Sequence, residues 1–208
     1  MKEKTIALAG NPNVGKSTIF NALTGMKQHT GNWPGKTVAN AAGSCVINGQ
    51  TYKITDLPGT YSLMAHSPEE EVARDYLCFE NPDLVIVVCD GTCLKRNLNL
   101  ALQIKEICDN IILCVNLMDE AKKKGISIDT KVLSDMLSCP VFAMSANSSK
   151  NIQEFKNFIH SNFNKKNSIG HIAYSEEIET AVSLTEPLVK KHYPDVNSRW
   201  LSLRLLEN

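Results

Sequence analysis

The stretch GNPNVGKST, at positions 10–18, constrains the fold of this chain more than any other feature of the sequence. It lies between the apolar run TIALAG (5–10) and an amphipathic stretch at 16–25, so a strand should enter the loop and a helix should leave it. In the pattern G-x-x-x-x-G-K-[ST], glycines let the backbone wrap a phosphate, while successive N–H groups and the helix N-terminus supply positive potential. We expect Lys16 to reach the β- and γ-phosphates of a nucleotide and Ser17 to ligate Mg²⁺.

Apolar runs alternate with amphipathic stretches along most of the chain, as strands and helices do in α/β proteins. Most of these runs are continuous, which indicates strands covered on both faces in a parallel sheet. Asn48-Gly49 is an exception, because this dipeptide favours a hairpin between antiparallel strands. The sequence thus predicts an α/β fold with a mostly parallel six-stranded sheet and one antiparallel edge strand. Strands are expected at 5–10, 44–47, 52–56, 84–90, 111–116 and 141–146, and helices at 16–25, 68–79, 97–108, 129–138 and 151–162.

The composition changes after the last of these helices, where the polar stretch NKKNSIGH (164–171) is typical of a linker. Two helical patterns follow, the first with Ser175 as its expected N-cap and with Pro187 expected to kink or restart it. We therefore predict a nucleotide-binding domain over 1–164 and a helical domain over 172–208. A helical tail of this length cannot bury its apolar residues alone, so it either packs on the main domain or is the truncated start of a larger one.

Another motif, DLPG (56–59), closes the second strand of the predicted hairpin. Asp56 can hold Mg²⁺ through water, and the Gly59 N–H can approach a γ-phosphate closely. D-x-x-G alone is a common turn and weak evidence, but its position forty residues after the phosphate-binding Lys16 makes it strong evidence for a nucleotide site.

NLMD (116–119) and MSAN (144–147) each follow or end an apolar run. The Asp119 carboxylate can accept two N–H bonds from the N1 and N2 edge of guanine, which adenine does not offer in that pattern. Ala146 can give its backbone N–H to guanine O6. Each tetrapeptide alone is also compatible with an ordinary turn at the end of a strand. Four motifs in this order, each at the end of a strand on one sheet edge, indicate a guanine nucleotide.

The stretch TGNWPGKTV (30–38) resembles a linker at first sight, since two glycines and Pro34 should keep it from settling into a helix or a strand. Thr37 lies about twenty residues after Lys16, where a GTPase places the hydroxyl that completes the Mg²⁺ shell when the γ-phosphate is bound. We expect this segment to be ordered by that contact and released on hydrolysis. For Trp33 two roles stay open: capping the nucleotide, or packing as the loop closes.

Composition excludes several classes of protein. Twenty-two basic and twenty-two acidic side chains cancel, which argues against a dedicated nucleic-acid binder. Seven cysteines without a C-x-x-C pair are typical of reduced core residues in a cytosolic protein, and the five histidines lack the spacing of a metal site. The N-terminus is not a signal peptide, and no apolar run approaches the ~20 residues that span a bilayer, so we expect this chain itself to be soluble.

Together these stretches resemble the FeoB family of ferrous iron transporters, within the TrmE-Era-Obg class of Ras-like GTPases. The matching stretches are GNPNVGKST, GNWPGKTV, DLPGTYSL with SPEEEVARDYL after it, NLMD and SAN. The likeness covers residues 4–163, and the tail RWLSLRLLEN resembles part of the helical domain that follows the G domain in that family. It implies a Ras-like P-loop GTPase fold with a C-terminal helical appendage. It also implies slow hydrolysis of GTP to GDP and phosphate in a switch that regulates ferrous iron transport.

The resemblance also implies partners, a location and a set of site residues. The partner is the membrane-embedded portion of the same transporter, at the cytoplasmic face of the inner membrane, with no nucleic acid, and the oligomeric state is left open. Catalytic roles fall to Lys16, Thr37 and Gly59, with Mg²⁺ held by Ser17, Thr37 and Asp56, and K⁺ held by Asn13. The nucleotide-binding residues are Gly10, Asn11, Pro12, Asn13, Val14, Gly15, Lys16, Ser17, Thr18, Gly35, Thr37, Asp56, Gly59, Asn116, Leu117, Asp119, Ser145, Ala146 and Asn147.

Two positions depart from familiar patterns. Leu117 stands where N-K-x-D has a lysine that packs on the base, and this predicts modest affinity for nucleotide. Thr60 stands where Ras-like proteins have a water-positioning glutamine, and this predicts slow hydrolysis. Glu69 and Glu70 are weak candidates for ordering the water, because acids just after Ser67-Pro68 suit the first turn of a helix.

Two alternatives remain at this stage. A ribosome- or tRNA-associated GTPase of the same class would share the motifs, but the balanced charge and the lack of a basic or GxxG tail argue against it. A small-molecule P-loop kinase would share the phosphate-binding loop, but NLMD followed by SAN argues against it.

Overall fold

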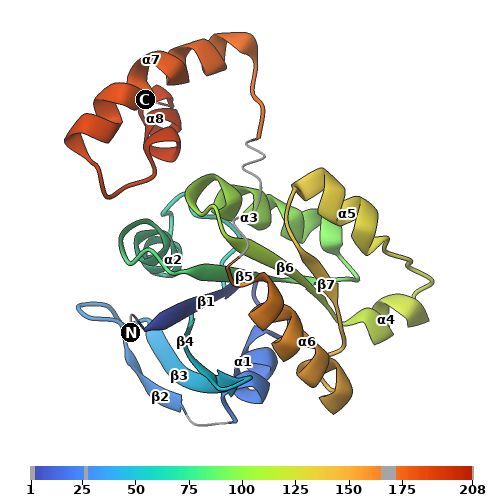
Figure 1. Ribbon diagram of the computed structural model, residues 1–208. Coiled ribbons are helices and arrows are strands. Elements are labelled where there is room, and N and C mark those ends of the chain that lie inside the picture. Colours follow the sequence, from blue (N-terminus) through green and yellow to red (C-terminus); the bar gives the residue numbers. More distant parts are fainter. Residues whose placement is uncertain (1–2, 26–27, 165–171, 208) are drawn as a thin grey trace.

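The computed structural model describes residues 3–25, 28–164 and 172–207. In this part of the chain a seven-stranded mixed sheet has the strand order β2-β3-β4-β1-β5-β6-β7, with helices on both faces (Figure 1). Strand β1 pairs parallel with β4 and β5, and the parallel pairing continues through β6 to β7, whereas β3 runs antiparallel to both β2 and β4. The predicted fold class is confirmed. The strands are β1 (Lys4–Gly10), β2 (Gln28–Asn32), β3 (Ala39–Ile47), β4 (Gln50–Asp56), β5 (Leu84–Asp90), β6 (Ile111–Asn116) and β7 (Val141–Ala143).

The sheet has one strand more than the sequence predicts, because residues 28–32 form the edge strand β2. Pro34 lies in the turn beyond this strand, where its missing N–H removes no bond from the ladder. The backbone N–H of Trp33 donates to the Val38 carbonyl at 2.8 Å and closes the hairpin between β2 and β3. The expectation that the stretch stays out of a strand is therefore wrong at this edge of the sheet.

The predicted hairpin between β3 and β4 is confirmed. Asn48 and Gly49 both have positive φ, at 50° and 78°, and they join Ile47 to its partner Gln50. Positive φ at both central residues is the geometry that makes Asn-Gly favourable in two-residue turns.

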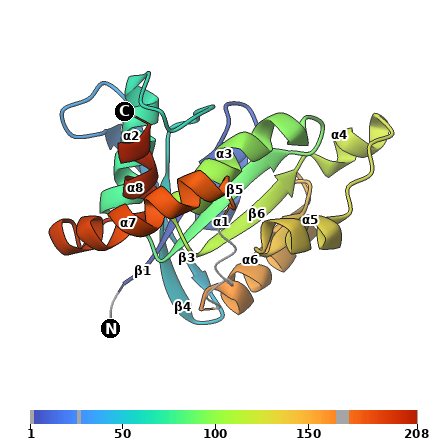
Figure 2. The same ribbon diagram turned by 90° about the horizontal axis from the view of Figure 1, so that it is seen from above.

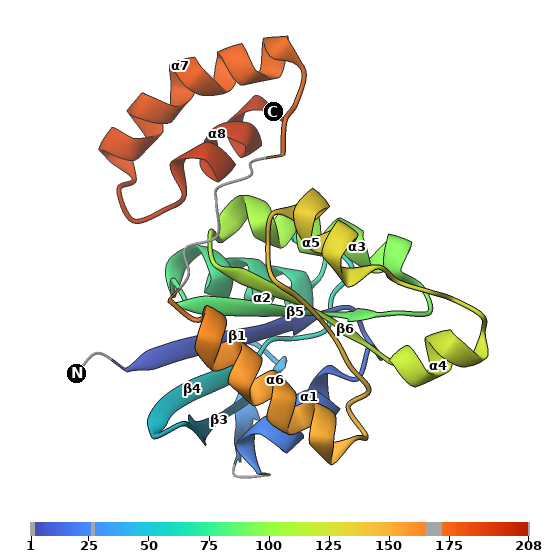
Figure 3. The ribbon, with the colours of Figure 1, turned by 45° about the vertical axis from the view of Figure 1, so that its right-hand side comes forward.

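Helices cover the sheet in two layers (Figures 1 and 3). One face carries α1 and α6, and the other carries α2, α3 and α5. Helix α4 follows β6 and is not predicted by the sequence. The bounds are α1 (Lys16–Thr24), α2 (Pro68–Phe79), α3 (Leu94–Ile107), α4 (Met118–Lys123), α5 (Thr130–Leu137) and α6 (Ser149–Asn162).

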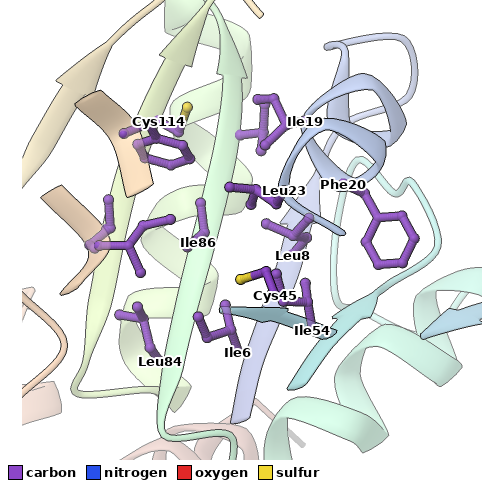
Figure 4. Packing of buried hydrophobic residues seen from close by; sticks show 14 of the residues in the cluster. Ile6, Leu8, Ile19, Phe20, Leu23, Cys45, Ile54, Leu84, Ile86 and Cys114 are labelled. Carbon is purple, nitrogen blue, oxygen red and sulfur yellow. The ribbon is translucent and has the colours of Figure 1, made fainter. Parts of the chain in front are cut away.

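The apolar layer under α1 fixes where the phosphate-binding loop sits. Ile19 and Leu23 of α1 are buried in one cluster with Leu8 of β1 and Ile86 of β5 (Figure 4). Burial of each such side chain contributes about 1.5–3 kcal/mol. The loop is therefore held at both ends, by a central strand and by a helix packed on the same sheet.

The cysteines follow the prediction in large part. Cys45, Cys78, Cys89, Cys114 and Cys139 are buried free thiols, and burial raises the pKa of Cys78 and of Cys89 to about 12. Thiols with such pKa values stay protonated and unreactive near neutral pH. The two others depart from the prediction, since Cys93 is exposed and Cys108 is half-buried.

The C-terminal residues form two helices, α7 (Glu176–His192) and α8 (Ser198–Leu206). Pro187 lies inside α7 without interrupting it, so the expected restart does not occur. Ser175 occupies the predicted N-cap position, although its side chain accepts no capping hydrogen bond. The predicted linker at 165–171 lies outside the described residues.

Helices α7 and α8 lie over the α2–α3 side of the sheet (Figure 2). The Asn197 side chain donates to the Ile107 carbonyl at 3.1 Å, and Asn81 donates to the Asp195 carbonyl at 3.3 Å. Trp200 packs against the apolar cluster beneath α2 and α3. The tail thus buries apolar surface on the main domain. Within the described ranges, none of the helices is both long enough and apolar enough to cross a bilayer.

Candidate functional site

The phosphate-binding loop has a backbone that only certain residues accept. Gly15 has φ 83° and Asn13 has φ 65°, both in the left-handed region. A Cβ atom on Gly15 would collide with the Asn116 side chain, and one on Gly10 would lie 2.5 Å from the Val88 carbonyl oxygen. The two glycines of the motif are therefore required by close approach, and Asn13 is of a type that tolerates positive φ. Helix α1 begins directly afterwards at Lys16 and points its N-terminus at the loop.

Lys16 and Asp56 form an ion pair at the centre of the site. The Lys16 ammonium also donates to the Leu57 carbonyl at 2.5 Å. Burial raises the pKa of the Asp56 carboxyl, and the Lys16 ammonium and the Ser17 side chain oppose that shift. The structure therefore brings together Lys16, Ser17 and Asp56, three of the residues predicted to meet the β/γ-phosphates and Mg²⁺. A hydroxyl and a carboxylate are oxygen donors of the kind that Mg²⁺ prefers, so this part of the donor set fits the ion.

The DLPG segment lies against the phosphate-binding loop. The Thr60 N–H donates to the Gly10 carbonyl at 3.2 Å, and a Cβ on Gly59 would lie 3.2 Å from the Pro12 Cα. Gly59 is thus held where its backbone can approach a phosphate on the loop. Thr60 is buried rather than open to solvent.

Asn116 joins the phosphate-binding loop to the segment after β7. Its side chain is fully buried, donates from Nδ2 to the Val14 carbonyl at 3.0 Å and accepts at Oδ1 from the Ala146 N–H, also at 3.0 Å. The Ala146 N–H predicted for guanine O6 is therefore engaged by Asn116 in this structure. Leu117, which follows, has φ 59° and starts α4.

Asp119 is exposed and lies next to Ser145 of the segment after β7. Its own N–H donates to the Ser145 hydroxyl oxygen at 3.1 Å. A hydrogen bond from the Ser145 side chain lowers the pKa of the Asp119 carboxyl, so the carboxylate is ionised and can accept hydrogen bonds. Ser145 is itself positioned by α6, because its N–H donates to Asn151 Oδ1 at 3.1 Å. Asn147 follows as an exposed residue.

Thr37 is exposed in the connection between β2 and β3. Among the described residues, no hydrogen bond joins it to Ser17 or Asp56, the other predicted Mg²⁺ ligands. The connection lies instead against α2, on the same side of the molecule (Figures 1 and 2). Trp33 packs edge-on against Tyr76, with ring centroids 5.4 Å apart, so its indole contacts α2 in this structure.

The first turn of α2 accounts for the acids that follow DLPG. Ser67 caps the helix by accepting from the Glu70 N–H at 3.2 Å, and Glu69, Glu70 and Glu71 lie in the first turn. Negative charge there suits the helix dipole, as predicted.

No group of three His, Cys, Asp or Glu side chains in the described ranges could hold a metal ion by itself.

Sequence reasoning missed the buried state of one residue of the loop. The Asn11 side chain is 2% exposed, and neither Nδ2 nor Oδ1 is hydrogen-bonded to any described residue. Its place in the motif identified it as a loop residue, but no pattern in the sequence indicated that its carboxamide is enclosed.

Comparisons with known proteins agree with this geometry. Residues 4–159 match the family described as Ferrous iron transport protein B. Residues 174–208 match the family described as FeoB cytosolic helical domain.

Similar curated proteins are much longer than this chain. The Fe(2+) transporter FeoB of Salmonella typhimurium is 36% identical over 211 residues, which covers 100% of this chain and 27% of that relative. The Fe(2+) transporter FeoB of Methanocaldococcus jannaschii is 57% identical over 107 residues, which covers 51% of this chain and 16% of that relative. The matched part is thus about a quarter or less of each of these relatives.

Solved structures with the same fold include nucleotide-bound forms. The cytosolic domain of the T. maritima FeoB iron transporter in a GDP form superposes with a TM-score of 0.88 at 39% identity, covering 97% of this chain and 79% of that chain. The same domain in a GMPPNP form gives 0.88 at 38% identity, covering 96% and 79%. The cytosolic domain of L. pneumophila FeoB gives 0.86 at 33% identity, covering 96% and 79%.

Proposed function

The chain belongs to the FeoB family of ferrous iron transport proteins, and from this premise we propose that it is the GTP-hydrolysing switch of such a transporter. It binds GTP, hydrolyses it to GDP and phosphate, and regulates the passage of Fe²⁺ through a membrane-embedded portion of the same protein. The observation that carries the proposal is the meeting of three loops at one sheet edge. Lys16 contacts Asp56, Gly59 abuts Pro12, and Asn116 bridges to Ala146.

The base is selected by Asp119. Its carboxylate, kept ionised by Ser145, accepts N–H bonds from the N1 and N2 edge of guanine. An adenine base presents no such pair of donors, so it cannot make these two hydrogen bonds with the Asp119 carboxylate. Asn116 fixes the position of this edge relative to the phosphate-binding loop by its two hydrogen bonds.

Hydrolysis is an attack of water on the γ-phosphorus, with the bond to the bridging oxygen breaking and GDP leaving. Lys16 turns from Asp56 to the β- and γ-phosphate oxygens, and the loop amides donate to the same oxygens. Ser17 and Asp56 would hold Mg²⁺, which when bound would neutralise charge on the phosphates. Gly59 donates its N–H to the γ-phosphate. Thr60 does not position the attacking water as a glutamine does, so hydrolysis is slow.

Two features of the proposal concern the switch and a second cation. Thr37 would complete the Mg²⁺ shell when the hairpin between β2 and β3 leaves α2, and it would return after hydrolysis. Asn13, exposed in the phosphate-binding loop, would hold K⁺, and a monovalent cation there would offset charge that develops in the transition state. The domain works at the cytoplasmic face of the membrane.

The test is GTP hydrolysis by this chain, measured separately in K⁺ and in Na⁺. We expect Lys16→Ala to slow hydrolysis by at least about 100-fold, because a donor to the developing charge is lost. Lys150→Ala, on the exposed surface of α6, serves as the matched control and leaves the rate unchanged. Hydrolysis that survives Lys16→Ala contradicts the proposed site. Equal rates in K⁺ and Na⁺ contradict the role of Asn13 alone.

A further inference from the structure

A cavity of about 210 Å³ lies between the β2–β3 hairpin and α2, and its lining includes none of the residues of the phosphate-binding loop. Trp33, Pro34 and Lys36 line it from the hairpin. Tyr76, Phe79 and Glu80, with Asp75 beside them, line it from α2. We call this space the hairpin groove.

Two contacts hold the hairpin in place and so form the groove. The Trp33 and Tyr76 rings meet at 75° in an edge-on arrangement. The Lys36 ammonium pairs with Glu71, which precedes Tyr76 on α2. The Tyr76 hydroxyl donates to Thr55 of β4 at 3.0 Å, so the floor of the groove is tied to the sheet.

The chemistry of the hairpin groove fits a cationic side chain. Three aromatic rings line it, and Phe79 is 63% exposed at its rim. Helix α2 and its C-cap carry five carboxylates and a single guanidinium, that of Arg74. Arg74 is engaged with Asp75 at 2.7 Å, and Lys36 is paired with Glu71. Glu80 is then the charged residue of the lining for which no ion pair is found within the described part of the chain. Aromatic faces beside carboxylates attract guanidinium and ammonium groups.

A second observation indicates that the occupant is a peptide segment rather than a free ion. The Trp33 indole Nε1 is buried and has no hydrogen-bond partner among the described residues. Indole N–H is only a donor, so it requires an acceptor such as a backbone carbonyl. A chain segment that brings a basic side chain and a carbonyl oxygen together satisfies both the charge and the indole.

We propose that the hairpin groove docks a basic cytoplasmic loop of the transporter's own membrane portion. This rests on the proposed function, since it requires that such a portion exists. About three quarters of the length of the Salmonella relative lies outside the part that this chain matches. Cytoplasmic loops of membrane proteins carry an excess of Lys and Arg. The acidic and aromatic groove is complementary to that excess.

The nucleotide state controls this docking. Trp33 and Thr37 belong to the same short connection, which the bond from the Trp33 backbone N–H to the Val38 carbonyl closes. A movement of this whole connection toward Mg²⁺ would draw Trp33 from Tyr76. The hairpin groove therefore exists in the arrangement seen here and is lost when Thr37 completes the Mg²⁺ shell. Docking and release of a basic loop would then make the contact between this domain and the membrane portion depend on the bound nucleotide.

The experiment is site-specific photocrosslinking in the full-length transporter in membranes. A photoreactive phenylalanine analogue replaces Phe79, and crosslinked peptides are identified by mass spectrometry with GDP and with GMPPNP. We expect adducts to a Lys- or Arg-bearing cytoplasmic loop of the membrane portion with GDP, and about fivefold fewer with GMPPNP or in Glu80→Gln. Glu154→Gln, which removes an exposed acid on α6, is the matched control and leaves the yield unchanged.

The outcomes separate the two proposals. The same analogue at Val132, which is exposed on α5, reports non-specific capture. Adducts from position 79 that do not exceed those from Val132, that map to a segment without Lys or Arg, or that are unaffected by Glu80→Gln overturn the docking proposal. GTP hydrolysis is measured on the same preparations, so intact hydrolysis without these adducts contradicts docking alone.

Discussion

At the scale of single residues, Asn11 carries a stability cost at the nucleotide site, because its buried side chain lacks hydrogen bonds to the described residues. Its carboxamide is buried within the phosphate-binding loop region, and neither of its polar atoms is hydrogen-bonded to a described residue. An unsatisfied buried polar group costs about 1–3 kcal/mol. Costs of this kind are typical of functional sites, where a residue is retained for activity rather than for stability.

We predict that Asn11→Ala leaves the free energy of unfolding of the nucleotide-free protein unchanged or raises it by about 1 kcal/mol, while slowing GTP hydrolysis. Asn116→Ala is the contrasting variant, because its carboxamide is fully bonded to Val14 and Ala146. It should lower stability by about 1–3 kcal/mol. Denaturant unfolding and single-turnover hydrolysis measure the two effects. Equal destabilisation by both substitutions would show that Asn11 is bonded through water.

At this scale the sequence predicts residue types better than contacts. Lys16 and Asp56 are predicted from motif and spacing, and the structure joins them in an ion pair. The bond from Ala146 to Asn116 is not predicted, because each residue alone gives only a role toward the base. A hydrogen bond between two residues thirty positions apart depends on how β6 and β7 align, and local sequence does not carry that information.

Among the elements, β2 shows why the sequence missed one strand. Residues 28–32 include Gly31 and lack a strong β-former pattern, so propensity favours a loop. Pairing with β3 overrides that preference, since β3 already offers a free edge beside the β3–β4 hairpin. The early part of β3, rich in Ala and Gly, was missed for the same reason. The central strands were predictable because their continuous apolar runs reflect burial on both faces.

The hairpin formed by β2 and β3 predicts a fluorescence change. In a Trp200→Phe background, Trp33 is the sole indole of this chain. Replacing GDP by GMPPNP should shift its emission to longer wavelength, because the indole leaves Tyr76 and enters water. Trp33→Phe in the same background should abolish the signal. An emission spectrum that is the same with both nucleotides would mean that the hairpin stays on α2.

Over the whole molecule, one carboxylate of the main domain contacts two residues of the helical appendage. The Glu106 side chain, on α3, is 9% exposed. The Tyr174 hydroxyl donates to one of its oxygens, and Arg204 of α8 lies 3.8 Å from the other. Sequence patterns predicted the two C-terminal helices, but this junction spans 68 residues and could not be read from them.

The junction makes the contact sensitive to alkaline pH. Burial, followed by the adjacent Glu106 carboxylate, raises the pKa of Tyr174 to about 12. The unfolded value is about 10, so the folded chain keeps the phenol protonated where the unfolded chain does not. The contribution of Tyr174 is therefore complete below about pH 10 and is lost as the pH rises toward 12.

We predict that Glu106→Gln lowers the pKa of Tyr174 and weakens the attachment of α7 and α8, because the phenol loses a charged acceptor and Arg204 loses a buried partner. Titration of tyrosinate absorbance, with Tyr174→Phe used to assign the signal, measures the pKa. Hydrogen exchange in α8 measures the attachment, and it should become faster. Glu207→Gln removes the exposed partner of Arg204 and should change neither quantity appreciably, since surface ion pairs contribute little. If Tyr174 titrates identically in Glu106→Gln and in the unsubstituted chain, then burial alone sets its pKa and the carboxylate does not hold the appendage in place.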